Sequence, residues 1–163
     1  MEAIPELVGL EATDQPSLPT YETIVQRLDQ LSFPTELQTE ISNLMSPNKT
    51  YIVRSSGLME DQASTSFAGQ YDSIANCTTT DDIIAALKQC IASLFKPAAI
   101  TYWQTHQLDV QNLRMSVIIQ EQVSAVSSGV AFTFNPLTNN DRQLTLEVVE
   151  GAGEQLVSGL VTP

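Results

Sequence analysis

The sequence predicts an α+β domain in which helices and strands form two layers. Residues 80–94 repeat their apolar side chains every three to four positions, as one face of a helix does. Four other segments are rich in β-branched, aromatic or alternating apolar residues, as strands are: 51–53, 115–123, 130–134 and 143–149. Helices mixed with short strands are typical of a two-layer domain around one hydrophobic core.

Composition limits the possible partners. The chain has 163 residues, of which 42% are hydrophobic, which suits one soluble domain. Its net charge of -12 disfavours a nucleic-acid or membrane partner, because those surfaces require clustered Lys and Arg. Cys77 and Cys90 form no CxxC motif, and we expect reduced thiols in a cytoplasmic protein.

The first third of the chain is predicted to be mainly helical. Residues 1–18 are acidic, contain two prolines and show no period, which indicates a loosely ordered lead-in. Thr20 is expected to cap a helix that ends near Leu31. Pro34 suits the first turn of a second helix. The inner face of that helix would consist of Leu37, Ile41 and Leu44.

The middle of the chain is predicted to alternate between strands and helices. A buried strand covers 51–53, and a second strand covers 71–76. Thr80 is expected to cap the long helix, whose two following aspartates favour the positive end of the helix dipole. Pro97 would start a further helix toward residue 106, with Ile100 and Trp103 in the core.

The last third is predicted to be mainly β-structure. The strand at 115–123 is followed by a turn at 127–129 and by the strand at 130–134. The strand at 143–149 alternates in hydropathy. Its inward residues would be Leu144, Leu146 and Val148.

Arg54 is the first candidate for chemistry. It ends the strand at 51–53, and it is one of only seven Lys and Arg residues in an acidic chain. Hydroxyl-bearing and small residues follow at 55–57 and 64–70. A guanidinium beside such loops suits phosphate binding. The alternative is a charged turn in which Arg54 pairs with Glu60 or Asp61.

Five blocks of the sequence together carry a family resemblance: VRSS at 53–56, MED at 59–61, SFAGQ at 66–70, SVIIQEQVSAVSSGVAFTFNP at 116–136 and EVVEGAGEQLVSGLVTP at 147–163. In these blocks and in their order, the chain resembles the ATP-binding domain shared by phosphoenolpyruvate synthase and pyruvate phosphate dikinase. Rifampicin phosphotransferases and glucan water dikinases share these blocks. The resemblance implies an incomplete ATP-grasp-like fold, with residues 19–163 as a partial ATP-binding domain.

The resemblance also implies an activity. Phosphoenolpyruvate synthase phosphorylates pyruvate from ATP through a phosphohistidine, so ATP and Mg²⁺ are the implied cofactors. Whether this chain is an enzyme is left open, because the family's K-G-x-N-L and L-Q-x-R-P segments have no counterpart in it. We expect a truncated, split or decayed relative that binds nucleotide. Its partners would be ATP and the enzyme's remaining domains in a separate chain. The alternative is a non-catalytic module that binds nucleotide or a partner protein.

The resemblance assigns the site residues. Arg54 would contact the ATP phosphates and act in catalysis, and the loop with Ser66, Ala68 and Gly69 would close over them, with an ordinary turn as the alternative. The segment Gln120, Glu121, Gln122 and Val123 would lie beside the adenine, and its alternative is a plain core strand. Thr133 would reach the ribose or phosphates, although threonine also favours strands. Three glutamates, Glu147, Glu150 and Glu154, could suggest a magnesium site, but we assign no metal ligand.

Overall fold

The computed structural model describes residues 19–57, 71–105, 114–135 and 138–160. The chain divides into two compact units, Met1–Gln122 and Val123–Pro163, and each is described by itself. Helices occur together with antiparallel sheets, which confirms the predicted α+β class.

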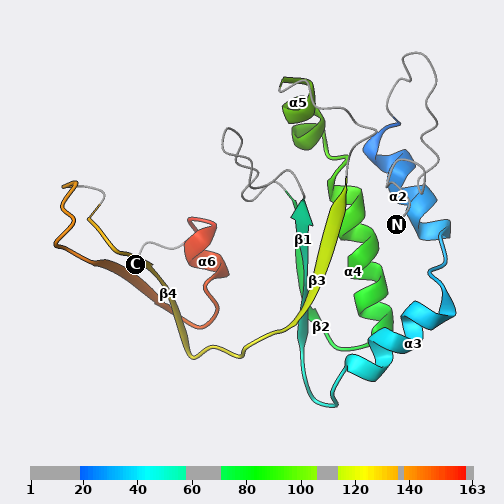
Figure 1. The fold of residues 1–163 in the computed structure, drawn as a ribbon, viewed down its shortest axis with the longest axis horizontal. Coiled ribbons are helices and arrows are strands. Elements are labelled where there is room, and N and C mark those ends of the chain that lie inside the picture. Colours follow the sequence, from blue (N-terminus) through cyan, green and yellow to red (C-terminus); the bar gives the residue numbers. More distant parts are fainter. Residues whose placement is uncertain (1–18, 58–70, 106–113, 136–137, 161–163) are drawn as a thin grey trace. The chain divides into compact units, whose positions relative to one another are not determined.

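The first unit is a three-stranded sheet covered by helices on one side (Figure 1). Its helices are α2 (Tyr21–Gln30), α3 (Thr35–Leu44), α4 (Thr80–Ser93) and α5 (Pro97–Thr105). Its strands are β1 (Tyr51–Gly57), β2 (Ser73–Cys77) and β3 (Met115–Glu121). Both neighbours of β1 run antiparallel to it, in the order β2-β1-β3, so the strand that carries Arg54 is central.

One hydrophobic cluster joins the sheet to α4. Side chains alternate along β1, so Tyr51 and Val53 point toward the helices and are buried. The cluster is completed by Ile41, Cys77, Ile83, Ala86 and Cys90. This packing gives the sheet one covered face.

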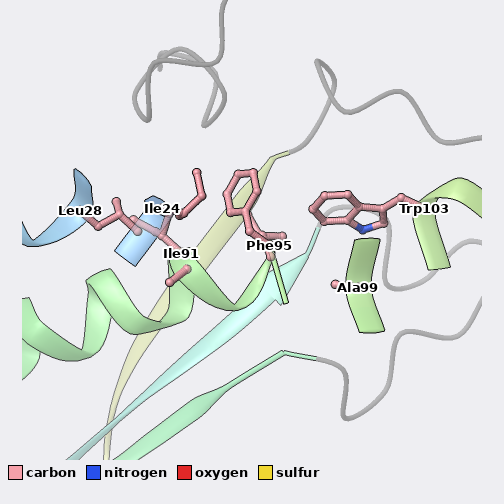
Figure 2. Packing of buried hydrophobic residues seen from close by; sticks show 8 residues of the cluster. Ile24, Leu28, Ile91, Phe95, Ala99 and Trp103 are labelled. Carbon is pink, nitrogen blue, oxygen red and sulfur yellow. The ribbon is translucent and has the colours of Figure 1, made fainter. Parts of the chain in front are cut away.

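A second cluster joins α2, the end of α4 and α5 (Figure 2). Ile24 and Leu28 of α2 meet Ile91 of α4, and Phe95 lies between these residues and Trp103. The rings of Phe95 and Trp103 meet edge to face, with centroids 5.9 Å apart and an interplanar angle of 84°. The predicted core position of Trp103 is confirmed.

The helix caps confirm one prediction and correct another. Thr20 caps α2, and its side chain accepts a hydrogen bond from the Thr23 backbone N–H. The cap of α4 is Thr79 instead of Thr80, which lies inside the helix. Thr79 accepts from the Asp82 N–H, and the Asp82 carboxylate accepts from the Thr79 N–H. This reciprocal pair makes Thr79 the better cap.

Two further local predictions were wrong. Leu44, expected on the inner face of α3, is 80% exposed, because it is the last residue of that helix. The predicted turn at 127–129 is the start of the strand β4 (Ser127–Phe132), where Gly129 pairs with Val148 of β5 (Thr145–Glu150). A side chain on Gly129 would come within 2.4 Å of the Glu147 carbonyl oxygen, so the glycine serves close strand packing.

The second unit consists of β4, β5 and the short helix α6 (Glu154–Val157). The prediction for the apolar side chains of the last strand was wrong, because they are at least half exposed: Leu144 65%, Leu146 62% and Val148 50%. The half-buried face of β5 carries Thr145, Glu147 and Val149 instead. Alternating hydropathy identified the strand, but it did not identify which face is covered within this unit.

The helical segment 80–105 is long and apolar enough, by composition alone, to cross a membrane. Half of its most apolar window is buried inside the protein, which is also typical of the core helix of a globular domain. The segment contributes Ile83, Cys90, Ile91, Phe95 and Trp103 to the two core clusters.

Candidate functional site

Arg54 lies on the face of the sheet opposite to α4. It follows buried Val53 on β1, and strand alternation therefore turns its side chain away from the helices. The Arg54 side chain is exposed. The strand was predicted to end at Arg54, but it continues to Gly57. The guanidinium therefore lies in the middle of a central strand, on a rigid element, and it is accessible to a ligand.

The strand register brings three polar side chains to this open face. Ser73 of β2 and Ile118 of β3 lie directly opposite Arg54 on either side. Gln120 lies opposite Ile52, which places it diagonally from Arg54, at roughly 7–8 Å between Cα atoms. Arg54, Ser73 and Gln120 thus share one face, with one cation, one hydroxyl and one amide.

Ser73 was not among the predicted site residues. It follows the SFAGQ segment by three positions, and nothing in its local sequence marks it as more than a strand residue. Only the pairing of β2 with β1 places its exposed hydroxyl beside Arg54. Long-range register of this kind is not visible in a single sequence.

The side chains of Glu121 and Gln122 make contacts at the end of the sheet. Glu121 forms an ion pair with Lys49, and its hydrogen bond and charge raise the pKa of the Lys49 ammonium group. The Gln122 side-chain oxygen accepts from the N–H of Asn76 at 2.9 Å. Asn76 has a φ of 63°, a left-handed conformation that asparagine tolerates. These contacts tie the end of β3 to β2 and to the residue Lys49 before β1.

The backbone of Glu121 presents one donor and one acceptor on the side away from β1. The N–H of Gln122 donates to the Thr50 carbonyl at 2.7 Å, so the backbone N–H and C=O of Gln122 point toward β1. Backbone directions alternate along an antiparallel ladder, and the N–H and C=O of Glu121 therefore point away from β1. Among the described strands β3 is at the edge of its sheet, so these groups lie along an outer edge.

The other predicted site residues lie either outside the described residues or in the second unit. Ser66, Ala68 and Gly69 lie outside the described residues. Val123 and Thr133 belong to the second unit, and both are exposed there. Thr133 directly follows β4.

The described residues contain no group of three or more His, Cys, Asp or Glu side chains that could hold a metal ion. Glu147, Glu150 and Glu154 therefore do not form such a group. No magnesium ligand is therefore assigned among the described residues.

A groove of about 520 Å³ lies elsewhere on the first unit, between α2 and α4. Its lining includes Tyr21, Val25, Ile84 and Lys88, none of which lies on the open face of the sheet. The Lys88 ammonium group donates to the Asp29 carbonyl at 3.1 Å. The exposed, polar face around Arg54 is the better candidate for an anionic ligand, because the groove holds two carboxylates, Asp29 and Asp81.

The sequence is similar to known proteins over nearly its whole length. The family described as pyruvate phosphate dikinase, AMP/ATP-binding domain, matches residues 7–163. A rifampicin phosphotransferase of Streptomyces sviceus is 34% identical over 162 residues, which are 97% of this chain and 19% of that protein. The rifampicin phosphotransferase of Bacillus subtilis (strain 168) is 36% identical over 142 residues, or 85% of this chain and 16% of that protein.

A second group of relatives carries a different name. The phosphoenolpyruvate synthase of Pyrococcus furiosus is 35% identical over 150 residues, which are 87% of this chain and 18% of that protein. The chain thus spans less than a fifth of the length of these curated relatives.

Proposed function

The chain belongs to the family of pyruvate phosphate dikinase AMP/ATP-binding domains, and on that premise we propose that it binds the phosphates of ATP at Arg54. The observation that carries the proposal is the position of Arg54, exposed at the centre of the open sheet face with Ser73 opposite. A guanidinium holds phosphate oxygens through a planar fork of N–H donors, and a hydroxyl can add a further donor.

The nucleotide would lie along the open face of the first unit. Arg54 and Ser73 would hold the phosphates, and Gln120 would lie farther along the same face toward the end of β3. The outward N–H and C=O of Glu121 would pair with the adenine edge, which needs one donor and one acceptor. Ser66, Ala68 and Gly69 are proposed to enclose the phosphates through their backbone N–H groups. Gln122, Val123 and Thr133 complete the proposed nucleotide contacts.

The whole protein's activity is proposed to be phosphoryl transfer from ATP. Relatives named rifampicin phosphotransferase and phosphoenolpyruvate synthase support this reaction class, and their names specify different compounds. Phosphoryl transfer depends on positioning and on charge neutralisation. Arg54 is the candidate catalytic residue, because its positive charge would meet the charge that develops on the transferred group. The remaining domains in a separate chain are proposed partners.

Mg²⁺ is proposed as the cation that accompanies ATP in this family. Because the described residues contain no group of three or more possible ligands, we assign it no protein ligand and no step. A second candidate function is nucleotide binding by this chain without catalysis of transfer. An assay of phosphate release from ATP, run alongside the binding measurement, distinguishes a chain that catalyses transfer from one that only binds nucleotide.

The first experiment is calorimetry with ATP and magnesium chloride at low salt, on the wild-type chain and on Arg54→Ala. We expect weak binding by the wild type, with a free energy of roughly -4 to -6 kcal/mol. Arg54→Ala should weaken it by about ten- to a hundredfold, because hydrogen bonds to charged groups contribute about 1.5–3 kcal/mol. Arg27→Ala, on the exposed side of α2, is the matched control and should bind like the wild type.

Two results would contradict the proposal. Folded wild-type protein that gives no heat with ATP would show that the family motifs no longer bind nucleotide in this chain. Equal losses in the two arginine variants would show that overall charge, instead of a site at Arg54, determines binding.

A further inference from the structure

Asp72 stands at the junction between the predicted phosphate loop and the open face. It follows Gly69 by three residues and directly precedes Ser73, the residue opposite Arg54. Its backbone carbonyl accepts hydrogen bonds from the Ser55 N–H at 3.4 Å and from the Cys90 thiol at 3.5 Å. The junction is therefore bonded both to the central strand and to α4.

The opposite backbone group of Asp72 is also held. Its N–H donates to the Ser93 hydroxyl at 3.2 Å, and that hydroxyl donates in turn to the Cys90 carbonyl at 2.7 Å. Ser93 is fully buried, and it is the buried polar residue among those described. A buried hydroxyl with both a donor and an acceptor partner orders its neighbours at little cost in desolvation.

The side chain of Asp72 makes a third connection. Its Oδ1 atom lies 2.6 Å from the Nζ atom of Lys96, in the turn between α4 and α5. Both side chains are about one third exposed, at 36% for Lys96 and 35% for Asp72. An ion pair this exposed contributes little to global stability. It does connect the residue before β2 to the turn between α4 and α5.

We propose that Asp72, Ser93 and Lys96, which we name the Asp72 network, are positioning residues that hold Ser73 beside Arg54. The inference rests on the proposed function, since it assigns the network to the same phosphate site. A hydrogen-bond donor that is held in place before the ligand arrives loses less conformational entropy on binding. Lys96 also neutralises a carboxylate that would otherwise repel phosphate.

A change of charge tests the network sharply, because simple electrostatics and the network predict opposite changes in ATP affinity. Asp72→Asn removes one negative charge from a chain of net charge -12, so simple electrostatics predicts tighter ATP binding. The network predicts weaker binding, because the ion pair is lost. We expect ATP affinity to fall by about two- to fivefold in Asp72→Asn and in Lys96→Met.

The controls use the same calorimetric titration of the 163-residue chain with ATP and magnesium chloride. Lys96→Arg keeps a cation within reach of Asp72 and should keep wild-type affinity. Lys88→Met removes a lysine from α4 at the groove, away from the open sheet face, and should also leave affinity unchanged. The thermal unfolding midpoint of each variant shows whether it is folded at the assay temperature.

The outcomes separate the two proposals. Weaker binding by Asp72→Asn and Lys96→Met, with retention by Lys96→Arg and Lys88→Met, supports the network. Wild-type affinity or tighter binding in Asp72→Asn overturns the network while ATP binding itself stands. No binding by the folded wild type overturns the proposed function and the network with it. Lys96→Arg that binds as weakly as Lys96→Met also overturns the network.

Discussion

The surroundings of Cys90 change the pKa of its thiol. The side chain is fully buried, and its thiol donates to the carbonyl oxygens of Val53 and Asp72. Burial, with a smaller contribution from the charge of Asp72, raises the pKa of Cys90 to about 12. The thiolate, which is the reactive form, is therefore rare at neutral pH.

We expect Cys90 to react very slowly with a thiol reagent at pH 8 in the native protein, and quickly in urea. Because its folded pKa is raised, its contribution to stability is complete below the ordinary pKa near 9.0 and is lost as the pH rises toward 12. The free energy of unfolding should thus fall more steeply between pH 9 and pH 11 in the wild type than in Cys90→Ala. Equal slopes in urea titrations of the two proteins would contradict this assignment.

Arg54 and Ser73 show the opposite situation, in which surroundings keep a residue accessible. Both side chains are exposed, although they belong to the sheet that forms the centre of the first unit. The identity of Arg54 as a candidate came from its local motif. Its partner Ser73 came from strand pairing, which only the folded chain supplies.

At the scale of the element, α4 organises the first unit. Its buried side packs on β1 and β2, and it also contacts α2 and α3. The helix begins with a capping box in which backbone and hydroxyl hydrogen bonds from Thr78 and Thr79 lower the pKa of Asp82 to about 2. The Asp82 carboxylate therefore stays ionised at neutral and mildly acidic pH. Its contribution to stability is lost only as the pH falls from about 4 through about 2.

We expect Thr79→Ala to lower the free energy of unfolding by about 1 kcal/mol, because an N-cap hydroxyl contributes about 0.5–2 kcal/mol. Urea denaturation at pH 7 measures the change. The adjacent Thr80→Ala is the matched control, since Thr80 lies inside the helix and is not its cap. A loss in Thr80→Ala as large as that in Thr79→Ala would favour the cap that the sequence alone predicted.

The element β5 shows the limit of sequence periodicity. Its alternation correctly predicted a strand, and the strand covers Thr145–Glu150. Its larger apolar residues, Leu146 and Val148, are nevertheless exposed. The more covered face of β5 carries Thr145, Glu147 and Val149, so hydropathy along the strand does not identify the buried face there.

At the scale of the whole molecule, the two units differ in how well they are packed. The first unit contains both large buried clusters, whereas the second has Leu156 as its buried hydrophobic residue among those described. An isolated pair of strands is marginally stable in water. The second unit should therefore open more readily than the first.

Hydrogen exchange of the full chain tests this difference. We expect backbone amides of β1 and α4 to exchange at least about tenfold more slowly than those of β4 and β5, because local stability follows buried apolar contact. The measurement compares hydrogen-bonded amides only, so that exposure alone does not determine the rates. Equal protection in the two sheets would show that the second unit is stabilised by contacts beyond those described within it.

Most elements of the first unit were predictable from the sequence because their signals are local. Helical spacing identified α2, α3 and α4, and β-branched content identified β1 and β3. Boundaries were less accurate where two candidates compete, as at Thr79 and Thr80, since the choice depends on which hydroxyl meets the Asp82 N–H. The family blocks indicated Arg54 and the nucleotide, and the match over residues 7–163 confirmed the family.

The sequence by itself determined the fold class, the family and the residue that carries the positive charge of the proposed site. These depend on short patterns and on composition, which are read along one chain. Only the tertiary structure decided that Ser73 and Gln120 share a face with Arg54, and that Asp72 is bonded to β1, α4 and Lys96. This arrangement brings together residues up to 66 positions apart in the sequence (Arg54 and Gln120). Their partners are chosen by strand register and helix packing, which are properties of the folded chain.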